Sequence, residues 1–293
     1  MSPIAFLYWR HLFLYAVYKL EHGVQDIYGI HAVLNVWNPR VVANDFSLSQ
    51  IWLYADRVQQ RNTIEVGWMV SLHLHRNVRN AGCQRHSCSD VDCPGFVITI
   101  QHVIDQWLPH VSVFDGIQYG IDVRIYQINP LAASEGLRNK PSNEHSSNDT
   151  KEASQPEKVN DKQIGYWPAS LLPRLALGAD TAGWGGEIID KYVFPHPTST
   201  QMGSGFFPSS GYKMATYISH LKYVDSHNHV VNPTKLIPYV TRRDCYDLQL
   251  GERREDAPLG VHFYFGGLGY NNPAGYLHFT QSCSLHIVIV ITK

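Results

Sequence analysis

The sequence predicts an all-β protein, an antiparallel β-sandwich built from two sheets. Three observations lead to this prediction. Residues typical of strands and tight turns are abundant, with 17 Tyr, 11 Phe, 22 Gly and 16 Pro against 17% charged residues. From Ile27 onward, apolar residues recur with a period of two rather than 3.6. Short apolar runs separated by turn residues are typical of a sandwich or a barrel.

The strand pattern is clearest in three early runs. Residues 31–39 end in the turn signal Asn38-Pro39. Residues 45–55 alternate, and residues 62–75 carry a continuous apolar stripe on one face with Glu65 on the other. Further strands are predicted at residues 95–104, 118–128, 185–194, 235–241, 260–267 and 284–292.

Helical periodicity is limited to residues 167–177 and 212–221, which predicts short helices or turns there. Residues 131–163 hold eleven charged residues and no aromatic residue. Such a segment buries too little apolar surface to offset the entropy of ordering it, so we expect a disordered insertion. Because similar strand patterns continue on both sides, residues 26–293 are predicted to be one domain.

Residues 1–25 are an atypical N-terminal segment. Arg10 and His11 interrupt its apolar run, and no charged region precedes that run. This order of apolar and charged residues differs from that of a secretory signal peptide, and the interruption argues against a membrane span.

Charge and cysteine content exclude several classes of function. The formal net charge is -1 and the isoelectric point is near 7.0, so there is no basic surface of the kind that nucleic acid requires. No Cys-x-x-Cys pair occurs, which argues against a four-thiolate zinc site. In an oxidising compartment, four of the cysteines could form two disulfides. The five are Cys83, Cys88, Cys93, Cys245 and Cys283.

Two other groups of side chains resemble parts of known metal sites. Asp225, His227 and His229 resemble the strand-end Asp-x-His-x-His of metal-dependent amidohydrolase barrels, but the 64 residues that follow are too few for such a barrel. His73 and His75 share a strand face, yet no third ligand is indicated. No metal and no cofactor are therefore expected. Cys83 or Cys88 as a nucleophile beside one of the 16 histidines stays an open alternative.

Two carboxylates stand out in the strand pattern. Glu65 points away from the apolar stripe of its strand, and Glu187 follows Gly185 and Gly186, which permit close backbone approach. Taken alone, each residue is most simply a solvated surface carboxylate.

The order of nine sequence blocks changes that interpretation. The blocks are YGIHAVLNVWNP, DFSLSQIW, NTIEVGW, CPGF, GYWPASLL, WGGEI, TQMGSGFFP, CYD and FYFGG. In this order, from about residue 26 to 271, the chain resembles the plant neprosin family. The resemblance implies a secreted or vacuolar two-sheet sandwich that cleaves peptides, characteristically after proline, with a pair of glutamates. By position, these are Glu65 in IEVGW and Glu187 in WGGE.

The implied mechanism is general acid–base catalysis. Two carboxylates facing one site cannot both ionise cheaply, so one would act as base and the other as acid, in an order that the sequence leaves open. Gln50 is a candidate oxyanion partner, and Trp68 and Tyr166 are candidates to line a proline-accepting pocket. The family pattern also suggests a disulfide between Cys88 and Cys93.

Two blocks of the family pattern are missing, one after Ser71 and one replaced by residues 131–163. Their absence predicts a sandwich that lacks one or two strands. It also leaves an alternative function open, a catalytically impaired paralogue that binds extracellular peptide or cell-wall material. In either case the expected partner is a peptide or protein, with no nucleic acid and no membrane span.

Overall fold

The computed structural model describes most of the predicted strands, and the statements below concern the described residues. They are 13–21, 23–24, 26–42, 45–55, 62–71, 87–89, 97–98, 108–127, 165–190, 198–252, 254, 256–270 and 284–292. The insertion predicted at 131–163 lies outside them, as do His73, His75 and Cys93.

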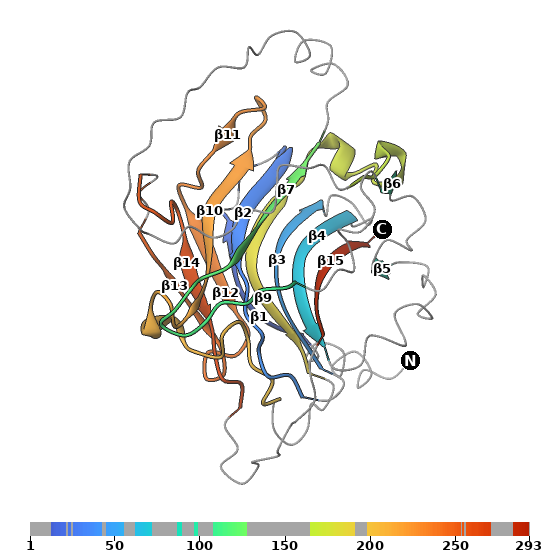
Figure 1. Cartoon of the computed structure of the whole chain (residues 1–293). Coiled ribbons are helices and arrows are strands. Elements are labelled where there is room, and N and C mark those ends of the chain that lie inside the picture. The colour runs from blue at the N-terminus through green and yellow to red at the C-terminus, as the bar shows by residue number, and fades with distance from the viewer. Residues whose placement is uncertain are drawn as a thin grey trace, which may run out of the picture.

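The described strands form two antiparallel sheets and a short pair (Figure 1). The first sheet has seven strands in the order β12 (Leu236–Val240), β1 (Phe13–Leu20), β9 (Thr181–Ile189), β3 (Phe46–Ala55), β4 (Asn62–Ser71), β15 (Ser284–Thr292) and β5 (Ser87–Ser89). The second has the order β13 (Asp247–Leu250), β14 (Phe263–Gly266), β10 (Thr216–Val224), β2 (Gly29–Asn35) and β7 (Gly120–Tyr126), with β11 (Val230–Val231) beside β10. The predicted all-β sandwich is confirmed.

The remaining elements are short. β6 (Val97–Ile98) pairs with β8 (Gly165–Tyr166) in a separate two-stranded sheet. The 3-10 helices are η2 (Ala169–Leu171), η3 (Leu175–Leu177) and η4 (Pro208–Ser210). Within the described part of the chain, no helix is long and apolar enough to cross a membrane.

One predicted element is only partly right. Residues 212–221 were expected to form a short helix or turn, and 212–214 do form a turn, but β10 begins at Thr216 and pairs with both β2 and β14. The pairing register with β2 shifts between Ser219 and Lys222, and His220 has a φ of 54°. This bulge interrupts the period-two alternation on which a strand prediction depends. The short helices predicted at 167–177 are present as η2 and η3.

The seven-stranded sheet includes part of the segment 1–25. Strand β1 pairs with β9 along one edge and with β12 along the other, and both pairings are antiparallel. Alternate residues of β1, including Ala16 and Tyr18, are buried between the two sheets. The sandwich therefore begins before residue 26.

Two tryptophans of the seven-stranded sheet form hydrogen bonds to strand β2 of the other sheet. The indole N–H of Trp68 donates to the carbonyl of Asn35 (3.1 Å), and that of Trp184 donates to the carbonyl of His31 (3.3 Å). Both side chains are fully buried in the core. Because a buried indole N–H needs an acceptor, these bonds fix how the sheets face each other.

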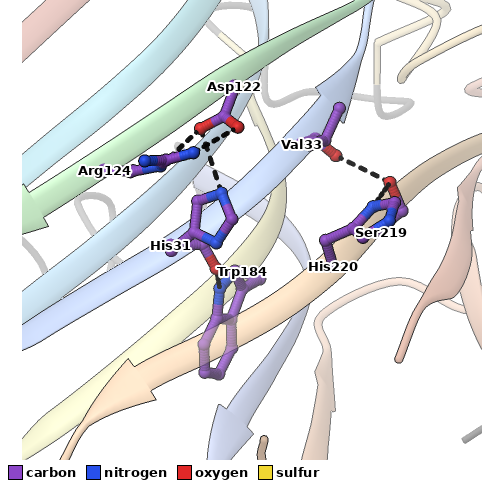
Figure 2. A network of polar contacts seen from close by, with 7 residues as sticks. All are labelled: His31, Val33, Asp122, Arg124, Trp184, Ser219 and His220. Atoms are coloured by element: carbon purple, nitrogen blue, oxygen red, sulfur yellow. Dashed lines mark hydrogen bonds and ion pairs between the residues drawn. The ribbon is translucent and has the colours of Figure 1, made fainter. Parts of the chain in front are cut away.

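A polar network covers β2 and β7 on the outer face of the second sheet (Figure 2). Asp122 accepts from the His31 ring (3.0 Å) and from the Arg124 side chain (2.9 Å to each carboxylate oxygen). Burial opposes ionisation of Asp122, but these partners outweigh it and lower its pKa to about 2.

We expect Asp122→Asn to destabilise the protein by about 1 kcal/mol at pH 6, because solvent screens this partly exposed network and reduces the full linkage value. A depressed carboxyl pKa contributes stability above pH ~4 that is lost as the pH falls towards about 2. Urea unfolding at pH 6 and pH 2 would measure this. A difference between variant and wild type that is equal at both pH values would contradict the assignment.

Candidate active site

Gln50, Glu65 and Glu187 lie on three neighbouring strands and on one face of the seven-stranded sheet. Directly paired residues of antiparallel strands share a face. Glu65 of β4 pairs with Trp52 of β3. Glu187 of β9 pairs with Leu48 of β3. Gln50 lies between Leu48 and Trp52, so regular strand geometry puts its Cα about 8 Å from the Cα of either glutamate.

This face is the outer one. The residues that alternate with Gln50, Glu65 and Glu187 belong to the core between the sheets. In Figure 1 strands β9, β3 and β4 bend together, with their concave side turned away from the six-stranded sheet. The two glutamates therefore occupy the concave side of the sandwich.

Glycines bring the strands close together on both sides of Gln50. Its direct partners are Gly67 of β4 and Gly185 of β9. A Cβ at Gly67 would lie 2.0 Å from the Ser49 carbonyl oxygen, and one at Gly185 would lie 2.2 Å from that of Ala16. No side chain fits at either position, which leaves Gln50 flanked by bare backbone. The close approach predicted from the double glycine is confirmed.

Glu65 is held by three side chains. The amide nitrogen of Gln50 donates to Glu65 Oε2 at 2.8 Å, and Trp52 and Thr63 also hydrogen-bond the carboxyl. Burial raises the pKa of Glu65 to about 7, although these bonds favour the charged form. Glu65 is therefore a carboxyl group that titrates near neutrality and whose anion already has donors.

The surroundings of Glu187 differ from those of Glu65, because burial and the neighbouring charge determine its pKa. Glu187 is only 7% exposed. Burial raises its pKa well above the ordinary value, and the charge of Glu65 raises it further. The two carboxyl groups therefore titrate as a coupled pair, and only Glu65 has side-chain hydrogen bonds that favour its charged form.

Apolar side chains surround the two carboxyl groups on the same face. They form a cluster separate from the main core, made of Val17, Leu48 and Trp52, with Tyr15, Phe46, Tyr54 and Met69 packed against it. Such an environment is costly for charge and explains the raised pKa values. It also offers aromatic surface next to the glutamates.

A comparison with known protein families shows to which family the chain belongs. The Neprosin family model matches residues 43–268 of the chain. The chain belongs to the neprosin family. The matched residues include β3, β4 and β9, and so Gln50, Glu65 and Glu187. Membership in the neprosin family indicates a peptidase type of function.

Two of the predicted substrate-binding residues lie elsewhere in this neprosin fold. Trp68 is three positions from Glu65 on β4 and is fully buried between the sheets, so it faces the opposite side and lines no outer surface. Tyr166 is on β8 of the two-stranded sheet, not on the glutamate face. Tyr54, on the same face of β3 as Gln50, and Tyr15 of β1 are only partly buried and provide aromatic surface on the glutamate face instead.

The cysteine prediction is only partly within the described residues. Cys88 lies on β5, whereas Cys93 falls outside them, so the proposed disulfide is untested. Cys245 is a buried free thiol, and burial raises its pKa to about 11. A thiol of this kind is a poor nucleophile.

The metal-like motif has a structural role. The Asp225 carboxylate accepts from the backbone N–H groups of His227 (2.9 Å) and His229 (2.8 Å). These bonds close the turn between β10 and β11. Among the residues that the structure describes, no three His, Cys, Asp or Glu side chains gather as a metal site would require.

Proposed function

We propose that this neprosin-family chain is a glutamic endopeptidase that hydrolyses peptide bonds by general acid–base catalysis. The observation that carries the proposal is the pairing of Glu65 and Glu187 on one face, where the charge of Glu65 acts on Glu187. The pKa values of both carboxyl groups are raised, so the pair can hold a proton near neutral pH and supply both an acid and a base at one carbonyl.

The environments of the two glutamates support distinct roles. The anion of Glu65 has three side-chain donors, which supports Glu65 as the base that activates water. Burial and the charge of Glu65 favour the protonated form of Glu187, which supports Glu187 as the acid that polarises the scissile carbonyl. We propose this order of base and acid, which the sequence leaves open.

The steps balance without a metal or a covalent intermediate. Glu65 takes a proton from water while the hydroxide attacks the carbonyl carbon, and Glu187 donates its proton to the carbonyl oxygen. When the tetrahedral intermediate collapses, the C–N bond breaks. The proton held by Glu65 passes to the leaving amine nitrogen, and Glu187 recovers its own proton. Gln50 is fully buried and its amide nitrogen donates to Glu65, so the contact supports a role in holding the base rather than the predicted contact with the carbonyl oxygen.

The aromatic face supports a proline-containing substrate. Proline-rich segments adopt an extended conformation with low entropy and dock on grooves lined with aromatic side chains. Trp52, Tyr54 and Tyr15 lie on the glutamate face. We therefore propose cleavage after proline. Secretion or a vacuolar location is proposed from the family resemblance alone.

The test is hydrolysis of a quenched fluorescent peptide with one central proline, compared with an alanine version. We expect cleavage after proline that resists chelators and inhibitors of serine and cysteine peptidases. Mass spectrometry of the products locates the cleaved bond. Binding of the peptide without cleavage would instead support the alternative of an inactive peptide-binding sandwich.

Gln50→Leu should shift the acidic limb of the kcat/KM profile to higher pH. The Gln50 hydrogen bond lowers the pKa of Glu65, so its loss raises that pKa and leaves less base at a given acidic pH. We expect a loss of about tenfold on the acidic side and a smaller loss at high pH. A uniform loss at every pH would contradict this role.

A further inference from the structure

A lysine shares the glutamate face at a distance from the carboxyl pair. Lys19 of β1 pairs with Gly183 of β9, which pairs with Trp52 of β3, the direct partner of Glu65. Lys19, Gly183, Trp52 and Glu65 therefore lie side by side in one row that crosses four neighbouring strands. A row of this kind on neighbouring strands points to one side of the sheet.

The ammonium group of Lys19 is positioned by aromatic rings rather than by a counter-ion. Its Nζ lies 4.8 Å from the ring centre of Tyr239 on β12 and 5.8 Å from that of Tyr54 on β3. Cation–π contacts leave the charge in place and hold the flexible side chain. The nearby Glu21 is already paired with Lys235, at 2.8 Å. No carboxylate among the described residues forms an ion pair with Lys19.

One glycine and one large side chain, Trp52, lie between Lys19 and Glu65 in this row. Gly183 carries no side chain of its own, and Lys19 Cγ and Trp52 Cε3 pack over it, each 3.8 Å from where a Cβ would lie. Tyr239, at the outer end of the neighbouring row, is 45% exposed. A peptide that extends from Glu65 over Trp52 would therefore meet Lys19 next, beside the exposed ring of Tyr239.

The geometry points to a specificity subsite in which Lys19, seated between Tyr54 and Tyr239, binds a carboxylate of the peptide substrate. This inference rests on the proposed endopeptidase function. Three strand spacings separate Lys19 from Glu65, about 14 Å, and an extended peptide advances about 3.3 Å per residue. Because the lysine side chain covers part of that distance, the carboxylate belongs two to four residues from the cleaved bond.

The experiment uses fluorogenic peptides with blocked ends, identical except for Glu or Gln at each of the four positions on either side of the cleaved bond. At pH 6, where a substrate glutamate is ionised, we expect one position at which Glu gives about tenfold higher kcat/KM than Gln. Lys19→Met should abolish this preference, and Lys19→Glu should transfer it to a Lys-containing peptide. A peptide with a free C-terminus tests whether a terminal carboxylate is bound instead of a side chain.

Lys235→Met is the matched control, because it removes the same charge from a lysine that already has a partner. It should keep the preference for Glu. Hydrolysis with no Lys19-dependent preference at any position would overturn the subsite while leaving the endopeptidase function standing. Conversely, affinities measured on the Glu187→Gln protein report on the subsite alone. If Glu peptides bind it more tightly only when Lys19 is present, the subsite stands even if the wild type hydrolyses nothing.

Discussion

Glu65→Gln and Glu187→Gln should each lower kcat/KM for the proline-containing peptide by at least about 10³-fold. Each substitution preserves size and hydrogen bonding but removes an essential proton acceptor or donor. Gln at 65 cannot take a proton from water, and Gln at 187 cannot pass one to the carbonyl oxygen. Because the two groups act as a unit, the double variant should be scarcely worse than either single variant.

Glu252→Gln is the control for this experiment, because Glu252 is an exposed glutamate on the loop after β13. It should leave kcat/KM unchanged. Circular dichroism of all variants establishes that they are folded. Activity that survives in either active-site variant at more than a tenth of the wild-type rate would rule out the proposed mechanism.

The sequence predicted the parts of this site that depend on alternation. Period two puts Glu65 opposite the core residues of β4, and the same rule puts Gln50 and Trp52 on one face of β3. What alternation cannot supply is the order of strands in the sheet. The family resemblance implied that Glu187 acts together with Glu65, but the position of β3 between β4 and β9 is known only from the structure.

The wrong expectations have local causes. Trp68 was a candidate for the substrate pocket because of its residue type, although its own position in the alternation puts it in the core, where its indole binds the Asn35 carbonyl. Residues 212–221 were misread because the bulge at His220 breaks the strand period. Lys19 was missed because β1 lies in the segment that was set apart from the domain.

The buried carboxyl pair should make the protein less stable as the pH rises. The folded-state pKa of Glu65 is about 7, and burial and Glu65 raise that of Glu187 well above its ordinary value. A raised carboxyl pKa means that the folded state binds protons more tightly than the unfolded state. The protonated carboxyl groups contribute their full stabilisation to the folded state below pH ~4.5, and this contribution is lost as the pH rises through the folded-state pKa.

Glu187→Gln should remove most of this loss, because a neutral amide of the same shape needs no proton to remain buried and ends the repulsion with Glu65. At pH 8 we expect the variant to exceed the wild type in free energy of unfolding by roughly 1–3 kcal/mol, the scale of a poorly compensated buried polar group. At pH 4.5 the free energies of unfolding of the two proteins should be equal.

Urea unfolding of both proteins across this range, with Glu252→Gln as control, measures the difference directly. If the wild type and Glu187→Gln keep parallel stability profiles, the two carboxyl groups do not share a buried site, and the structural basis for assigning them as acid and base is lost. Stabilisation by a substitution that also abolishes turnover would instead mean that the catalytic pair is maintained at the expense of folding stability.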